Sequence, residues 1–263
     1  MSVPIYQVDA FANRPFRGNP AAICLLAEEA DPDWMQDVAA EMNLAETAFV
    51  RPLQNGFELR WFTPIFEVDL CGHATLAAAH VLWTESIVDL EATITFHTRS
   101  GPLTCRRDGR LIELDFPATP PEPVDAAHEL LAALGISEAS YIGRSPFDKV
   151  VVVDSEELVR SLEPDFARLA EFPMRGVIVS AALENSEFDF ISRFFAPAAG
   201  VNEDPVTGSA HCCLGPYWAQ ILGKSDMLAF QASKRGGVVQ VRVRDDRILL
   251  GGEAVTIMKG ELI

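Results

Sequence analysis

Three side chains of this sequence lie in contexts suited to moving a proton. Glu46 is flanked by apolar residues, and an apolar environment favours the neutral form of a carboxyl group, as a general acid/base near neutral pH requires. His73 follows a glycine at a predicted helix start, where the helix dipole disfavours the charged ring and favours a neutral imidazole. Asp204 stands before a proline, just upstream of a second such helix. Each of these residues also has an ordinary structural interpretation. Glu46 equally suits a solvated loop, His73 suits a structural position, and Asp204 suits a turn or a helix cap.

Cys71 and Thr207 directly precede the two glycines that open these predicted helices. Two thiols at such matched positions could act as base and acid on opposite faces of a carbon atom, as in a racemase, but here only Cys71 carries a thiol. A threonine hydroxyl does not replace a thiolate as a base, although it can assist a leaving group. Cys71 also suits a small buried position at a helix start, so both interpretations stay open.

One short pattern containing these residues occurs twice. Residues 69–75 read Asp-Leu-Cys-Gly-His-Ala-Thr, and residues 204–210 read Asp-Pro-Val-Thr-Gly-Ser-Ala. Each copy follows an aromatic-rich segment that ends in proline, and each is followed by a small apolar run. The pattern predicts that a strand, a loop and a helix are built twice, with Asp69 in the same place as Asp204.

Helix starts of this kind are candidate sites for an anionic small molecule. The first amides of a helix have no partner within the helix, and the positive end of the helix dipole also favours negative charge. Gly72, Gly208 and Ser209 are therefore candidate substrate-binding residues, together with Cys71 and Thr207. A substrate with a carboxylate group would suit them.

Composition and charge narrow the classes of partner. The net charge is −17, from 21 Lys and Arg against 38 Asp and Glu, which argues against nucleic acid as a partner because phosphate backbones require clustered cations. The five cysteines are odd in number and show no C-x-x-C spacing, so we expect no disulfide framework and no structural metal site. No signal-peptide pattern and no run of 18 apolar residues occurs, so we expect a cytoplasmic protein that does not act in a membrane.

The pattern of elements predicts an α+β fold with two similar lobes. The apolar runs 72–83 and 208–222 are typical of helices that are buried on all sides, each inside a mainly antiparallel, curved sheet or barrel. A proline-dense segment at 116–123 reads as the linker, so we predict lobes at 1–117 and 118–263. Further predicted elements are strands at 6–11, 21–26, 47–51, 58–62, 150–153, 177–180 and 188–195, a hairpin through 106–110, and helices beginning at 31 and over 126–134.

Four ordered motifs together resemble the PhzF family of phenazine-biosynthesis proteins, within the diaminopimelate-epimerase-like fold. The resemblance covers essentially the whole chain. It rests on Val8–Phe11 with Gly18–Ala21, on Asn43–Thr47, on Cys71–Thr75 and on Glu203–Ala210.

The resemblance implies a homodimer of two-lobed chains that uses no metal and no organic cofactor, with the active site in the cleft between the lobes. It implies that Glu46 is the general acid/base, and that His73 and Asp204 position the substrate and help the proton transfer. Backbone amides at the two helix starts would hold the substrate's carboxylate and polar groups. Thr207 stands where the epimerase relatives of this fold have a second catalytic cysteine, which argues against a two-thiol mechanism.

Three hypotheses follow for the function. The first is a cofactor-independent isomerase that shifts a proton on a small carboxylate-bearing substrate, such as a cyclic hydroxy-amino acid. The second is a racemase, epimerase or dehydratase that uses Cys71 as its single base, with Thr207 assisting loss of a hydroxyl group. The third is a non-catalytic protein that binds a small molecule on the same scaffold.

Overall fold

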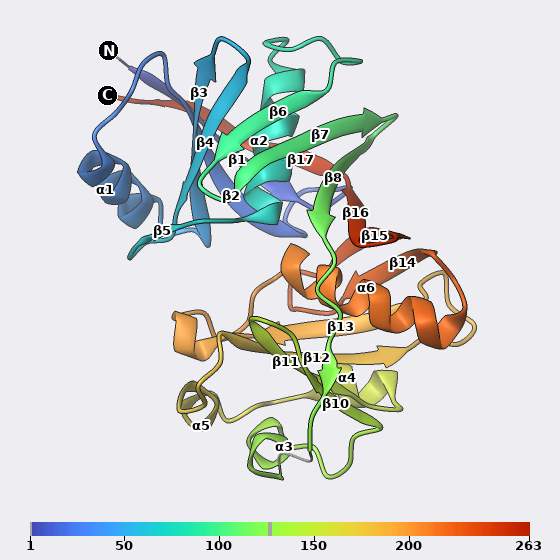
Figure 1. The fold of residues 1–263 in the computed structure, drawn as a ribbon. Helices are drawn as coiled ribbons and strands as arrows, with labels where there is room; N and C mark the ends of the chain where they lie inside the picture. Colours follow the sequence, from blue (N-terminus) through green and yellow to red (C-terminus); the bar gives the residue numbers. More distant parts are fainter. Residues whose placement is uncertain (1, 126–127) are drawn as a thin grey trace. The chain divides into compact units, whose positions relative to one another are not determined.

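The computed structural model describes residues 2–125 and 128–263, which form two compact units (Figure 1). Unit 1 consists of residues 1–116 and 251–263, and unit 2 of residues 117–250. The predicted second lobe, 118–263, is therefore wrong at its C-terminal end. The last strand pairs with the first strand of the chain, Val3 opposite Leu262, and this pairing returns the C-terminal residues to unit 1.

The elements of unit 1 are consecutive in the sequence, except for the last strand, which comes from the C-terminal residues. They are β1 (Val3–Ala10), β2 (Asn19–Leu25), α1 (Pro32–Met42), β3 (Glu46–Leu53), β4 (Gly56–Phe62), β5 (Glu67–Val68), α2 (Gly72–Thr84), β6 (Ile94–Thr98), β7 (Gly101–Asp108), β8 (Leu111–Pro117) and β17 (Ala254–Leu262). The sheet runs in the order β17-β1-β2-β3-β4-β6-β7-β8, with β5 also pairing with β4.

The elements of unit 2 lie between β8 and β17 in the sequence, and the last of them, β16 (Arg247–Gly252), has its final two residues in unit 1. The elements are β9 (Glu122–Pro123), α3 (His128–Leu134), β10 (Tyr141–Arg144), β11 (Asp148–Val152), α4 (Glu156–Ser161), α5 (Phe166–Ala170), β12 (Gly176–Ala182), β13 (Phe190–Phe195), the 3-10 helix η1 (Pro197–Ala199), α6 (Gly208–Leu222), β14 (Asp226–Gln231), β15 (Gly237–Arg244) and β16 (Arg247–Gly252). The sheet order is β9-β10-β11-β12-β13-β14-β15. The first two residues of the predicted helix 126–134 lie outside the described residues.

The two units repeat one strand order and one set of strand directions. In unit 1 the parallel pairs are β2–β3 and β4–β6, and in unit 2 they are β11–β12 and β13–β14. The other pairings given above are antiparallel, so each sheet is mixed rather than purely antiparallel. Helix α2 follows β4 in unit 1, and α6 follows β13 in unit 2. The duplicated sequence pattern thus corresponds to a duplicated fold.

The central helix of unit 1 is α2, which packs against β1, β2, β3 and β17 (Figure 1). Ten of its 13 residues are buried, because its small apolar side chains let strands approach it closely from several directions. Gly252 shows how close that approach is, since a Cβ there would lie 3.2 Å from Leu76 of α2 and 2.3 Å from the ring of Phe11. In unit 2, α6 packs in the same way against β14 and β15.

Candidate functional site

The loop before each central helix is braced by an arginine–glutamate pair. In unit 1, Arg60 on β4 donates to Glu67 through Nε at 2.7 Å and Nη2 at 2.8 Å. In unit 2, Arg193 on β13 donates to Glu203 through Nε at 2.7 Å and Nη2 at 3.0 Å. Each arginine also lies over the ring of the phenylalanine two residues later. Two-point ion pairs of this kind fix geometry, so each loop delivers its helix start in a defined position.

Both central helices begin without a side-chain cap. Cys71 and Thr207 occupy the N-cap positions, and neither side chain hydrogen-bonds to the first turn. No acidic residue lies in either first turn. By contrast, Asp31 caps α1, Ser155 caps α4 and Asp165 caps α5. The amides of both central helices therefore remain available to an anionic ligand.

Glu46 and His73 are brought together in unit 1. Glu46 is the first residue of β3, and its Oε2 lies 3.1 Å from Nε2 of His73 at the start of α2. The His73 side chain is buried, and 19 % of the Glu46 side chain is exposed. Nε2 of the ring is thus at ion-pair distance from a carboxylate oxygen, although neither atom forms a hydrogen bond of good geometry within the described part of the chain. Two such groups at this distance are candidates for proton transfer.

The other ring nitrogen of His73 faces Cys71 and Asn19. Nδ1 lies 3.5 Å from the Cys71 sulfur and 3.2 Å from Nδ2 of Asn19. Asn19 is held there by the preceding Gly18, which has a φ of +64° and whose missing side chain leaves room for the carbonyl oxygen of Ala10. We call Asn19, Glu46, Cys71 and His73 the imidazole cluster.

The surroundings of His73 act against the neutral imidazole that is expected at a helix start. Burial disfavours the charged ring, but the Cys71 sulfur and the Glu46 carboxylate outweigh it and raise the pKa of His73 well above its ordinary value. The sequence did not reveal this carboxylate neighbour. Burial and the Glu46 carboxylate raise the pKa of the Cys71 thiol, and the neighbouring His73 opposes that rise.

Glu46, Cys71 and His73 are also a set of residues that could hold a metal ion. One potential ligand atom from each lies within 4.8 Å of the others. However, the His73 ring faces the sulfur with Nδ1 and the carboxylate with Nε2, and one ion cannot bind both nitrogens of one ring. The arrangement therefore fits a chain of proton donors and acceptors better than a metal centre with three ligands.

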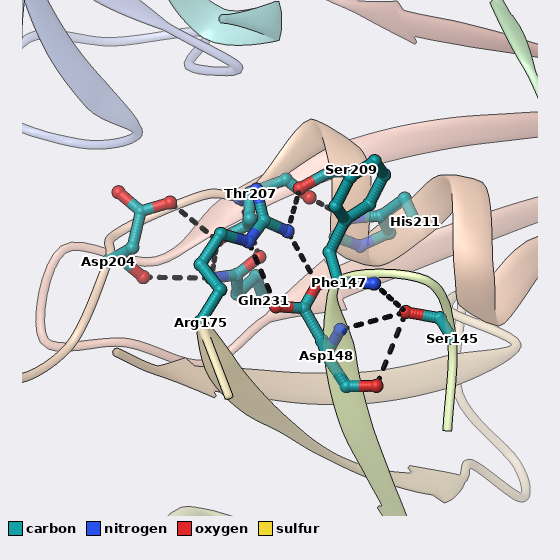
Figure 2. A network of polar contacts seen from close by, with 9 residues as sticks. All are labelled: Ser145, Phe147, Asp148, Arg175, Asp204, Thr207, Ser209, His211 and Gln231. Atoms are coloured by element: carbon teal, nitrogen blue, oxygen red, sulfur yellow. Dashed lines mark hydrogen bonds and ion pairs between the residues drawn. The ribbon is translucent and has the colours of Figure 1, made fainter. Parts of the chain in front are cut away.

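Asp204 and Thr207 lie together in unit 2, before α6. The Thr207 hydroxyl donates to Oδ2 of Asp204 at 2.5 Å. Buried Gln231 on β14 accepts from the Thr207 amide at 2.8 Å and donates to the carbonyl oxygen of Asp204 at 2.8 Å (Figure 2). Sequence analysis missed Gln231, because a lone glutamine near the end of a strand gives no local signal.

Asp69 does not match Asp204 in the structure. Its side chain is 75 % exposed and lies 4.0 Å from Arg99. Asp69 is two residues before the N-cap Cys71, whereas Asp204 is three residues before the N-cap Thr207. Because of this one-residue difference, the two aspartates do not occupy equivalent positions as predicted, although the helices themselves correspond.

Arg175 is a second residue that sequence analysis missed. It lies just before β12, and its guanidinium donates to Asp148 from Nε at 2.9 Å and from Nη2 at 2.5 Å. Nη2 also donates to the Ser209 hydroxyl at 2.8 Å, at the start of α6 (Figure 2). Burial raises the pKa of the Asp148 carboxyl, and the ion pair with Arg175 limits that rise. Ser209, a predicted substrate-binding residue, thus lies beside a cation.

Comparisons with known proteins identify the family. The profile of the PhzC-PhzF phenazine biosynthesis-like proteins matches residues 8–260. The chain belongs to this PhzF family. An uncharacterized isomerase of Halalkalibacterium halodurans is 53 % identical over 100 % of this chain and 99 % of its own length. The crystal structure of a PhzF-family protein of Enterococcus faecalis has a TM-score of 0.95 and 42 % identity, with both chains fully covered.

A more distant likeness concerns the fold alone. The hydroxyproline epimerase of Agrobacterium vitis has a TM-score of 0.64 and 12 % identity, covering 99 % of this chain and 91 % of that one. The predicted epimerase-like fold is therefore confirmed at the level of the α/β architecture. Among residues 2–125 and 128–263, no helix is long and apolar enough to cross a membrane.

Proposed function

We propose that this chain is an isomerase that moves a proton between two atoms of a small carboxylate-bearing substrate, with Glu46 as the general acid/base. The carboxylate of Glu46 takes a proton from one carbon atom and returns it to another, so that no co-reactant is consumed. The contact between Glu46 and His73 carries this proposal, because the imidazole at 3.1 Å is placed to orient the carboxylate and to exchange a proton with it. The isomerase named among the relatives of this chain supports the same reaction class.

The uncapped starts of α2 and α6 support an anionic substrate. The amides of Gly72 and His73 and those of Gly208 and Ser209 have no side-chain cap that a ligand would have to displace. In a chain with a net charge of −17, such local dipoles are needed to hold an anion. Asp204 is proposed as an assisting residue in the same reaction, held in position by Thr207 and Gln231.

Incorporation of deuterium from D₂O tests the proposal. The protein is incubated with a panel of cyclic hydroxy-amino acids and small amino acids, and exchange is followed by mass spectrometry. Glu46→Gln keeps the shape of the side chain and should reduce exchange by about 10²- to 10⁴-fold. Glu41→Gln, an exposed glutamate of α1, is the matched control and should leave exchange unchanged. Undiminished exchange in Glu46→Gln would show that Glu46 is not the acid/base.

Cys71→Ala separates this proposal from the alternative in which Cys71 is the base. The raised pKa of the thiol disfavours the thiolate that a racemase or dehydratase of that kind needs. We therefore expect Cys71→Ala to retain substantial exchange activity. Loss of exchange in Cys71→Ala, with exchange retained in Glu46→Gln, would support the racemase or dehydratase instead.

A further inference from the structure

Unit 2 contains a cavity of about 510 Å³ beside the hairpin of β10 and β11. Its lining combines cations with apolar groups: Arg144, Pro146, Phe147, Asp148, Lys149, Pro173, Met174 and Arg175. Three cationic side chains therefore stand against one carboxylate, that of Asp148, which Arg175 already binds at two points. We call this cavity the cationic pocket.

Arg144 and Lys149 are placed against each other in the sheet. They are directly opposite in the β10–β11 register, so their side chains leave the same face of the hairpin. Like charges in this position destabilise a strand pair. Neither side chain forms an ion pair within the described part of the chain, although Glu122 on β9 is the neighbour of Arg144 on its other side. This destabilising pair of cations is present in a strongly acidic protein, which indicates that a negatively charged ligand binds beside it.

Arg175 adds a third cation that is held rigidly. Its guanidinium lies over the rings of Phe147 and Phe194, at 5.4 and 5.6 Å from the ring centroids. Its side chain is 41 % exposed, so part of the group remains accessible to a ligand. Figure 2 shows the Phe147 ring beside this guanidinium.

Phe147 gives the pocket an apolar surface. It is 56 % exposed, although it belongs to a tight turn in which the Ser145 hydroxyl accepts from the amides of Phe147 and Asp148. The turn fixes the backbone, so the ring is presented to solvent by a rigid element. A ligand with a flat apolar group can cover this ring while its anionic group meets the cations.

We propose that the cationic pocket binds a small molecule in which a doubly charged anionic group, such as a phosphate monoester, is joined to a flat apolar body. The anionic group would lie between Arg144, Lys149 and Arg175, and the apolar body against Phe147. This site lies within unit 2, and the proposal does not depend on the proton-transfer reaction assigned to Glu46.

Calorimetric titration with phenyl phosphate tests the proposal, with inorganic phosphate and benzyl alcohol as the anion-only and ring-only probes. Phenyl phosphate should bind more tightly than either fragment. Arg144→Gln/Lys149→Gln should weaken phenyl phosphate binding by about tenfold, the sum expected for two partly exposed charge contacts. Phe147→Ala should weaken phenyl phosphate binding but leave inorganic phosphate binding unchanged.

Arg106→Gln/Arg168→Gln is the charge-matched control, since both arginines are exposed and lie outside the pocket. It should bind phenyl phosphate as the unmodified protein does. Equal weakening in both double variants would mean that net charge alone drives binding and would overturn the proposal. Absence of phenyl phosphate binding to the unmodified protein at millimolar concentration would overturn it as well.

Thermal unfolding without ligand checks that Arg144→Gln/Lys149→Gln folds. Relief of the repulsion between the two cations should leave its melting temperature equal to or above that of the unmodified protein. Phenyl phosphate should then raise the melting temperature of the unmodified protein more than that of the variant. An equal rise in both would contradict the assigned location.

Discussion

Replacing Glu46 by glutamine should lower the pKa of His73. In the structure the Glu46 carboxylate lies 3.1 Å from Nε2 of a buried imidazole, where solvent screens the interaction weakly. An opposite charge at this range changes a pKa by about 1–3 pH units, or about 1.4–4 kcal/mol. Glutamine keeps the shape of the side chain and removes the charge. Burial then acts with less opposition, so the pKa of His73 should fall by that amount.

The pKa of His73 can be measured by NMR titration of the imidazole protons between pH 5 and pH 9. The His73 signal is assigned from its loss in His73→Gln. Burial lowers the pKa of His211 to about 4, and burial together with the charge of Arg107 lowers the pKa of His80 to about 4. The signals of these two histidines therefore stay constant over this range. Glu41→Gln is again the matched control. The same His73 pKa in Glu46→Gln and in the unmodified protein would refute the coupling inferred from the structure.

The same pair makes stability depend on pH in a definite direction. The pKa of His73 is raised in the folded state, above an unfolded value of about 6.5. The contribution of the pair is therefore fully present below pH 6.5 and is lost as the pH rises through the folded pKa. Urea unfolding of the unmodified protein and of Glu46→Gln should show a stability difference that shrinks as the pH rises.

Three further substitutions test how the sites are held. Gln231→Ala removes the partner of the buried Thr207 amide and one donor to the partly buried Asp204 carbonyl, and should reduce the free energy of unfolding by about 1–3 kcal/mol in urea titrations, whereas exposed Gln54→Ala should have little effect. Gly18→Ala should cost more than about 1 kcal/mol, because its φ is +64° and the new Cβ would lie 2.0 Å from the Ala10 oxygen; unaltered thermal stability would contradict this. Leu76→Ala should cost about 2.7–5 kcal/mol through a cavity beside α2, measured against half-exposed Leu53→Ala.

The central helices were predictable because their signals are local. A glycine opens each helix, and a run of small apolar residues continues it, so α2 and α6 were placed to within one residue of their observed ends. Helix α1 was predictable for a similar reason, since Asp31 caps it and Pro32 begins it. Helices α4 and α5 were missed, because five or six residues carry too little periodicity to stand out.

Pairing between distant segments was not predictable in the same way. Nothing in residues 254–262 indicates that they pair with residues 3–10, so the C-terminal strand was assigned to the wrong unit. The partners of Thr207 and Ser209 were hidden for the same reason. Gln231, on β14, and Arg175, just before β12, reach them from 24 and 34 residues away in the sequence. Glu46 was a candidate from its apolar surroundings, but its contact with His73 emerged only from the fold.

The return of β17 to unit 1 has a consequence for the order in which the chain folds during synthesis. Unit 2 is one continuous stretch, residues 117–250, and all of it is synthesised before β17, the second partner strand of β1. Unit 1 begins first but lacks β17, so one edge of β1 stays unpaired while unit 2 is translated. Unit 1 therefore completes its sheet only when residues 254–262 emerge. The imidazole cluster thus lies in a unit whose sheet closes only after all of unit 2 has been synthesised.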